Sequence, residues 1–121
     1  MSRLQGKRVL VVEDDIELAA MLDEYLAGIG MVVVGPAFNL VQAELFSAQL
    51  DVDVAILDMW LQSDRVDPLA SRLRERGVAF VVATGSAASI AAQPPGVVCL
   101  HKPYALAEME EALLRATDAP A

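Results

Sequence analysis

The sequence predicts an α/β fold in which a five-stranded parallel sheet carries helices on both faces. Two observations support this prediction. Short apolar runs rich in valine alternate with amphipathic runs five times along the chain. The apolar runs are continuous rather than alternating in polarity, which is typical of strands covered on both faces. Such an alternation of strands and helices favours a parallel sheet with right-handed crossovers.

The first half of the chain contains three predicted strands and two predicted helices. The strands are expected at 8–12, 31–35 and 53–58, and the helices at 15–27 and 39–49. In the first helix, Leu22 and Leu26 are four residues apart and therefore share a face. Asn39 stands where its side chain can cap the second helix, and Gly28 and Gly30 mark the end of the first.

The second half of the chain contains the remaining elements, with strands expected at 78–83 and 97–100 and helices at 66–76 and 105–116. Residues 77–100 carry no charge, and this stretch is long enough to cross a bilayer. Turn-forming residues at 84–86 and 93–96 interrupt it. We therefore expect two buried strands joined by a short or irregular fourth helix.

Composition limits the possible classes of protein. A chain of 121 residues with 55% hydrophobic residues suits one ordered domain, with a core expected at about 6–117. The net charge of -8 argues against binding nucleic acid or an anionic membrane. The single cysteine, Cys99, excludes an internal disulfide and fits a reducing compartment, and no signal peptide is visible. We therefore expect a cytoplasmic protein.

Polar residues follow four of the five predicted strands. The first strand is followed by Glu13, Asp14 and Asp15, whereas the third ends at Asp58. The fourth ends at Thr84 and the fifth at Lys102. Because ligands bind beyond the carboxyl ends of strands in such a sheet, these side chains are predicted to form one site.

The residue types at this edge indicate a particular chemistry. Carboxylates from Asp14, Asp15 and Asp58 cannot gather without a cation, and Mg²⁺ is the divalent ion that prefers such oxygen ligands and bridges to phosphate. Asp58 is the most central and is the candidate nucleophile for an acyl phosphate. Lys102 and Thr84 would then hold phosphoryl oxygens. Alternatively, the acidic triplet marks only a helix N-terminus.

At this point the sequence resembles a known family. The motifs VLVVEDD, AILDMWL, VATGS and HKPY are similar, in order and spacing, to those of the receiver domain of bacterial two-component response regulators. The resemblance covers nearly the whole chain. It implies a flavodoxin-like (βα)5 fold with strand order 2-1-3-4-5. It also implies Mg²⁺-dependent transfer of a phosphoryl group from a kinase phosphohistidine to an aspartate.

The resemblance assigns a role to each residue at the predicted edge. The metal-binding acidic pair corresponds to Asp14 and Asp15, supported by the preceding Glu13. The phosphoacceptor corresponds to Asp58, and the backbone carbonyl in the metal shell is that of Trp60. The phosphate-binding hydroxyl corresponds to Thr84 and the family's lysine to Lys102. Pro103 follows that lysine, and the family's Lys-Pro bond is usually cis. We further expect the Trp60 side chain to shield the acyl phosphate, so that Trp60→Ala speeds dephosphorylation.

The chain departs from the family pattern at three places. The switch aromatic, three residues before the lysine, is replaced by Cys99. Only 17 residues separate Thr84 from Lys102, so the fourth helix and a dimer face built on it are in question. The proline and glycine loop after Asp58 is replaced by QSDRVDPLA. The motif FVVATGS resembles the F-x-F-A-T-G type motif of stand-alone alphaproteobacterial receivers.

Two functions therefore remain open. The first is a single-domain response regulator that takes a phosphoryl group on Asp58 from a histidine kinase or a histidine phosphotransfer protein. It would assist its own phosphorylation without being a conventional enzyme, and it would signal through a downstream protein or by onward transfer, as a monomer or weak dimer. The second is an interaction module that keeps the fold but does not use phosphorylation.

Overall fold

The computed structural model describes residues 3–61 and 63–118. Its central element is a five-stranded parallel sheet in the order β2-β1-β3-β6-β7. These strands are β1 (Arg8–Val12), β2 (Val32–Ala37), β3 (Val54–Asp58), β6 (Ala79–Thr84) and β7 (Val98–His101). Since β6 and β7 are the fourth and fifth strands of this sheet, the predicted flavodoxin-like order 2-1-3-4-5 is confirmed.

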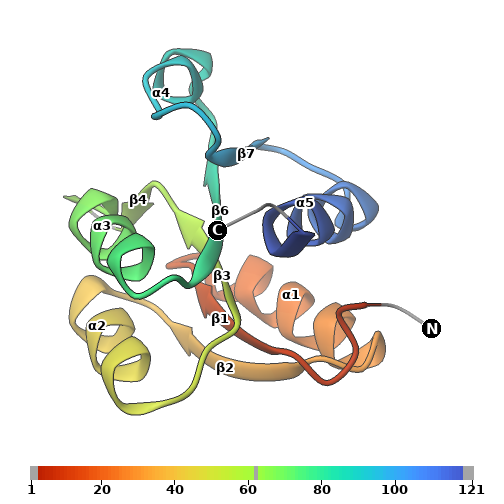
Figure 1. Ribbon diagram of the computed structural model, residues 1–121. Helices are drawn as coiled ribbons and strands as arrows, with labels where there is room; N and C mark the ends of the chain where they lie inside the picture. Colours follow the sequence, from red (N-terminus) through yellow and green to blue (C-terminus); the bar gives the residue numbers. More distant parts are fainter. Residues whose placement is uncertain (1–2, 62, 119–121) are drawn as a thin grey trace.

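Helices cover both faces of the sheet. They are α1 (Ile16–Gly28), α2 (Leu40–Gln49), α3 (Asp67–Glu75), α4 (Ala87–Ala91) and α5 (Leu106–Asp118). Helices α1 and α5 lie on one face, and α2 and α3 lie on the other (Figure 1). The four long helices begin and end within two residues of the predicted bounds. This arrangement leaves the carboxyl ends of the strands free of covering helices.

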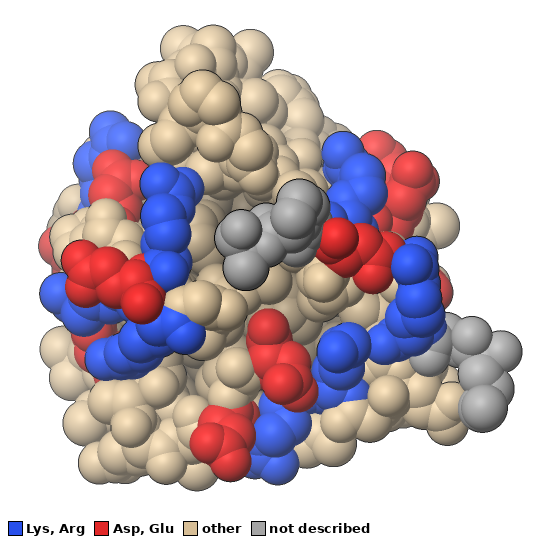
Figure 2. All heavy atoms as spheres, in the orientation of Figure 1, with Lys and Arg blue, Asp and Glu red and all other residues tan. Residues whose placement is uncertain are grey.

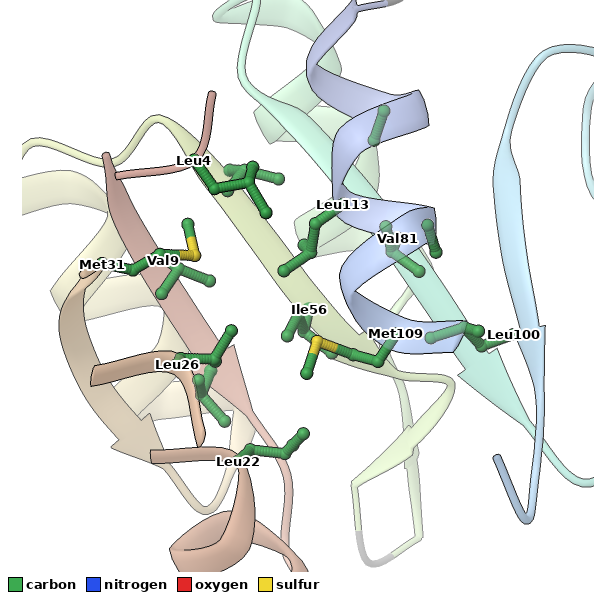
Figure 3. Close-up of a cluster of buried hydrophobic side chains, with 14 of the residues drawn as sticks. Leu4, Val9, Leu22, Leu26, Met31, Ile56, Val81, Leu100, Met109 and Leu113 are labelled. Carbon is green, nitrogen blue, oxygen red and sulfur yellow. The ribbon is translucent and has the colours of Figure 1, made fainter. Parts of the chain in front are cut away.

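Two hydrophobic clusters hold the layers together. One lies between the sheet and helices α1 and α5, where Leu22 and Leu26 pack near Met109 and Leu113 (Figure 3). The other lies under α2 and α3; its buried residues include Leu10, Leu57, Ala43, Leu69 and Leu73. Adjacent strand residues contribute to opposite clusters. This explains why the strand sequences are continuously apolar.

Helix α4 is short, as predicted. It contains five residues, none of them buried, and Ser86 caps its N-terminus by accepting a hydrogen bond from Ser89 N. The uncharged stretch 77–100 forms β6, α4 and β7 rather than one long helix. In Figure 2 the surface over α4 carries no charged side chain. Within residues 3–61 and 63–118, no helix is long and apolar enough to cross a membrane.

A small antiparallel hairpin between β3 and α3 was not predicted. It consists of β4 (Trp60–Leu61) and β5 (Asp64–Arg65), in which Trp60 pairs with Arg65. The hairpin occupies the segment in which the chain departs from the receiver pattern. Strands of two residues are too short to produce a periodic pattern, so the sequence indicated only an atypical loop there.

Candidate functional site

The sheet brings the predicted residues to one edge. Asp58 is the last residue of β3 and pairs with Ala83 on β6, which places Thr84 one residue beyond that pair. The backbone N–H of Lys102 donates to the Thr84 carbonyl oxygen at 2.8 Å, so the chain after β7 stays beside β6. The edge therefore joins residues that are separated by up to 89 positions in the sequence.

The centre of this edge is an ion-paired group of three side chains. The ammonium of Lys102 lies 2.9 Å from Glu13 Oε1 and 3.2 Å from Asp58 Oδ2. Glu13 is 2% exposed and Asp58 is 8% exposed. Because buried carboxylates are unstable without a partner, this ammonium is what allows both of them to remain in the interior.

Three carboxylates meet beside this ammonium. One oxygen each from Glu13, Asp14 and Asp58 lies within 4.8 Å of the other two. One positive charge cannot balance three negative charges at such distances. A group of hard oxygen donors with surplus negative charge fits a divalent cation, and Mg²⁺ is bound in proteins through one or two carboxylates.

The acidic pair that joins Asp58 in the structure is Glu13 and Asp14, one residue earlier than the predicted pair Asp14 and Asp15. Asp15 Oδ1 accepts hydrogen bonds from Glu17 N and Leu18 N at 3.0 and 3.1 Å, so its carboxylate caps α1. Asp15 lies outside the group of carboxylates that meet near Lys102, and Glu13, which was predicted only to support the site, belongs to it. The helix-start interpretation therefore holds for Asp15 but not for its two neighbours.

The position of Glu13 follows from the residue at which β1 ends. Glu13 follows Val12, the last residue of β1, so its side chain still belongs to the edge of the sheet. Its other carboxylate oxygen, Oε2, accepts a hydrogen bond from Asp15 N at 3.1 Å. Glu13 thus joins the helix start to the ion-paired group.

Proton equilibria are shifted at this site. Burial and, after it, the nearby Glu13 raise the pKa of Asp58 to about 7, although Lys102 acts in the opposite direction. Burial alone would lower the pKa of Lys102, but Glu13 and Asp58 outweigh it, so the pKa of the ammonium is raised. Near neutral pH, Lys102 is therefore charged, whereas the Asp58 side chain is present in both its protonated and its ionised form.

Thr84 lies one residue beyond the strand pair of Asp58 and Ala83, and Trp60 follows Asp58 by two residues. Thr84 is buried, and its hydroxyl oxygen accepts a hydrogen bond from Ser86 N at 3.2 Å. The backbone N–H of Trp60 lies 3.4 Å from Asp58 Oδ1, at the long end of the hydrogen-bond range. The Trp60 side chain is 45% exposed. The two oxygens of Asp58 thus face different donors, Trp60 N–H and the Lys102 ammonium.

Pro103 and Cys99 are the remaining predicted positions. The Lys102-Pro103 peptide bond is cis, as the family resemblance implied. Cys99 is half-buried on β7, where it pairs with Val82 of β6. Burial raises the pKa of the Cys99 thiol. A small thiol therefore occupies the position where the family carries its switch aromatic.

Tyr104 is a half-buried residue near the site for which the sequence predicted no role. Its hydroxyl is buried without a hydrogen-bond partner in the described part of the chain. Burial raises the pKa of Tyr104 to about 12, with Glu13 as the next cause. The ring packs against the cluster under α1 and α5. Tyr104 thus fills space behind the ion-paired group while its hydroxyl stays unsatisfied.

Comparison with known proteins gives a clear result for the fold. No protein-family model matches the chain, and no curated protein does. Among solved structures, the receiver domain of PhyR from Erythrobacter litoralis is similar with a TM-score of 0.83 and 18% identity, covering 99% of this chain and 98% of that one. SdrG from Sphingomonas melonis Fr1 is similar with a TM-score of 0.77 and 28% identity, covering 96% and 98%.

A longer protein also matches. The response regulator PhyR from Brucella abortus is similar with a TM-score of 0.80 and 18% identity over 95% of this chain. That match covers 49% of the Brucella protein, so the chain spans about half of its length. The similar structures include receiver domains from several bacteria. The chain therefore has the flavodoxin-like fold of response regulator receiver domains.

Proposed function

We propose that the chain is a receiver domain that accepts a phosphoryl group on Asp58. The observation that carries this proposal is the contact of the Lys102 ammonium with Asp58 Oδ2 at 3.2 Å. A carboxylate at the end of a central strand, with a cation against one oxygen and further carboxylates nearby, has the parts that a phosphoryl acceptor needs.

The proposed reaction is one displacement at phosphorus. A carboxylate oxygen of Asp58 attacks the phosphorus of a phosphohistidine, an O–P bond forms, the P–N bond breaks, and the imidazole leaves and takes up a proton. Lys102 stabilises the negative charge on the transferred group, and Thr84 lies where its hydroxyl would donate to another oxygen. Attack by water on the acyl phosphate would later restore the Asp58 carboxylate and release inorganic phosphate.

The donor set fits Mg²⁺. We propose Asp14, Asp58 and the Trp60 carbonyl as ligands, because the Asp15 carboxylate caps α1 and Glu13 is held by two closer contacts, from Lys102 at 2.9 Å and from Asp15 N at 3.1 Å. Bound there, the ion would neutralise the surplus negative charge of the carboxylates and of the incoming phosphoryl group. The same neutralisation would favour the ionised form of Asp58, which is the nucleophilic form.

The partners follow from this chemistry. The phosphoryl donor is a histidine kinase or a histidine phosphotransfer protein. The downstream partner that responds to the phosphorylated domain is another protein. We place the domain in the cytoplasm, where a kinase can reach it, as a monomer or weak dimer that binds no nucleic acid. The FVVATGS segment, which keeps Phe80 and Ala83-Thr84-Gly85, supports a relation to the F-x-F-A-T-G type receivers.

Incubation with Mg²⁺ and acetyl phosphate tests the proposal. We expect intact mass to show addition of one phosphoryl group to the wild-type chain, with none on Asp58→Asn. Asp53→Asn is a matched control, because this aspartate lies just before β3, away from the ion-paired group. If the wild type gains no phosphoryl group, the alternative of a phosphorylation-independent interaction module stands instead.

A further inference from the structure

The segment that follows Asp58 folds so that Arg65 faces Trp60. The two residues are opposite each other in the β4–β5 hairpin, and Val66 N donates to the Met59 carbonyl oxygen at 2.9 Å. The Arg65 guanidinium lies over the indole ring, 5.3 Å from its centroid. This is the geometry of an attractive cation–π contact.

Two further contacts fix the Arg65 guanidinium. Its Nε lies 2.6 Å from Oδ2 of Asp67, the first residue of α3, and its Nη2 lies 3.9 Å from Met59 Sδ. An exposed ion pair alone contributes little. Here three contacts act on one planar group. Because Trp60 is 45% exposed, the core does not enclose it, and the Arg65 guanidinium restrains the position of its ring.

Trp60 in turn contacts the phosphoacceptor through its backbone. Its N–H lies 3.4 Å from Asp58 Oδ1, on the oxygen that Lys102 does not contact. We propose that Arg65 is a positioning residue for the Asp58 site: by stacking on the Trp60 ring while it is paired with Asp67, it fixes the Trp60 N–H beside the acceptor carboxylate. This inference rests on the proposed function.

The chemical role of Arg65 is to keep the Trp60 N–H, a hydrogen-bond donor, in place before the reaction begins. During phosphoryl transfer the negative charge to be stabilised is on the oxygens of the transferred group, so an N–H beside the acceptor carboxylate assists by donating to one of them, and only if it is already held there. Without Arg65, the ring is free to move and residue 60 moves with it. A cation–π contact at an exposed site is weak, so the expected loss is about two- to fivefold in the rate of phosphorylation.

The test compares matched arginine variants in acetyl phosphate with Mg²⁺, with the rate followed by intact mass. Arg65→Gln is expected to react two- to fivefold more slowly than the wild type. Arg65→Lys keeps the charge but loses the planar group that stacks and pairs, so it is expected to be slowed as well. Arg72→Gln is the control, since this exposed arginine pairs with Glu44 away from the site and should react at the wild-type rate.

A second measurement needs neither metal nor phosphate. Hydrogen exchange of the Trp60 amide, followed by NMR in the metal-free protein, is expected to be faster in Arg65→Gln and unchanged in Arg72→Gln. In a Trp60→Ala background, Arg65→Gln should have no further effect on the phosphorylation rate, because the contact that it removes is already absent.

The outcomes separate this inference from the proposed function. A wild-type chain that takes up no phosphoryl group overturns both. A wild type that is phosphorylated at Asp58, with an equal rate and equal amide exchange in Arg65→Gln, overturns only the role of Arg65. Full recovery of the rate in Arg65→Lys, or an additive loss in the Trp60→Ala background, would show that the charge of Arg65 acts without Trp60 and would also overturn it.

Discussion

The Lys102 ammonium lies 3.2 Å from Asp58 Oδ2 and also 2.9 Å from Glu13 Oε1. A single cation thus holds two buried carboxylates that come from different strands. The side chain of Lys102 is itself 26% exposed, so it enters the edge of the sheet from the solvent side. This relationship makes the site sensitive to charge, and the following predictions test that sensitivity.

Removal of the Lys102 charge is expected to destabilise the protein. In Lys102→Met the packing of the stem is kept, but Glu13 and Asp58 lose their cation, so the free energy of unfolding should fall by roughly 2 kcal/mol. Urea unfolding at pH 7.5 in EDTA measures this. Lys7→Met, at the opposite end of β1 and without an ion pair among the described residues, should stay within about 0.5 kcal/mol of the wild type. Equal losses in both variants would contradict the prediction.

The raised pKa of Asp58 predicts a pH-dependent stability. Because the folded protein holds this proton up to about pH 7, whereas the ordinary pKa of an aspartate is 3.8, the folded state binds more protons between these values. The contribution of Asp58 is therefore fully present below about pH 4 and is lost as the pH rises through 7. Asp58→Asn removes this loss.

The measurement is the difference in unfolding free energy between Asp58→Asn and the wild type, both in EDTA. This difference should favour the variant by about 2 kcal/mol more at pH 8 than at pH 5, since one pKa unit corresponds to about 1.4 kcal/mol. Asp53→Asn, near the start of the same strand, is the control. A difference that does not change with pH would mean that Asp58 is ionised throughout.

Much of this fold was predictable from the sequence for a simple physical reason. Strands that are covered on both faces must be apolar along their covered length, and the runs at 9–12 and 54–57 are apolar and buried throughout. The meeting of Asp58 and Lys102 at one edge of the sheet was predictable, because both lie at the carboxyl ends of buried strands, where a charge has few structural uses. The strand order followed from the family resemblance.

The separate roles of the three acidic residues and the contact within the hairpin could not be predicted from the sequence. Glu13, Asp14 and Asp15 have the same chemistry, and their separate roles depend on the residue at which β1 ends and α1 begins. Such boundaries are uncertain by one or two residues in a sequence pattern. The contact between Trp60 and Arg65 depends on a hairpin whose strands are two residues long, and no periodicity predicts it.

The division of roles within the triplet predicts different responses to Mg²⁺. The ion should stabilise the wild type, by about 2.7 kcal/mol at a concentration one hundred times its dissociation constant. Asp14→Asn should lose most of this gain because it removes a proposed ligand. Asp15→Asn should keep it, because asparagine caps a helix as well as aspartate does. Thermal unfolding with and without Mg²⁺ measures both; the reverse pattern would restore Asp15 as the ligand.

Tyr104 provides a test of packing next to the site. A buried hydroxyl without a partner has lost its hydrogen bonds to water and gained none, so Tyr104→Phe should raise the free energy of unfolding by about 1 kcal/mol. The other tyrosine is the matched control: the Tyr25 hydroxyl donates to Glu110, so Tyr25→Phe should not stabilise the protein. Urea unfolding of both variants decides the matter. If Tyr104→Phe instead destabilises the chain, the Tyr104 hydroxyl makes a hydrogen bond in the folded protein, which contradicts the prediction.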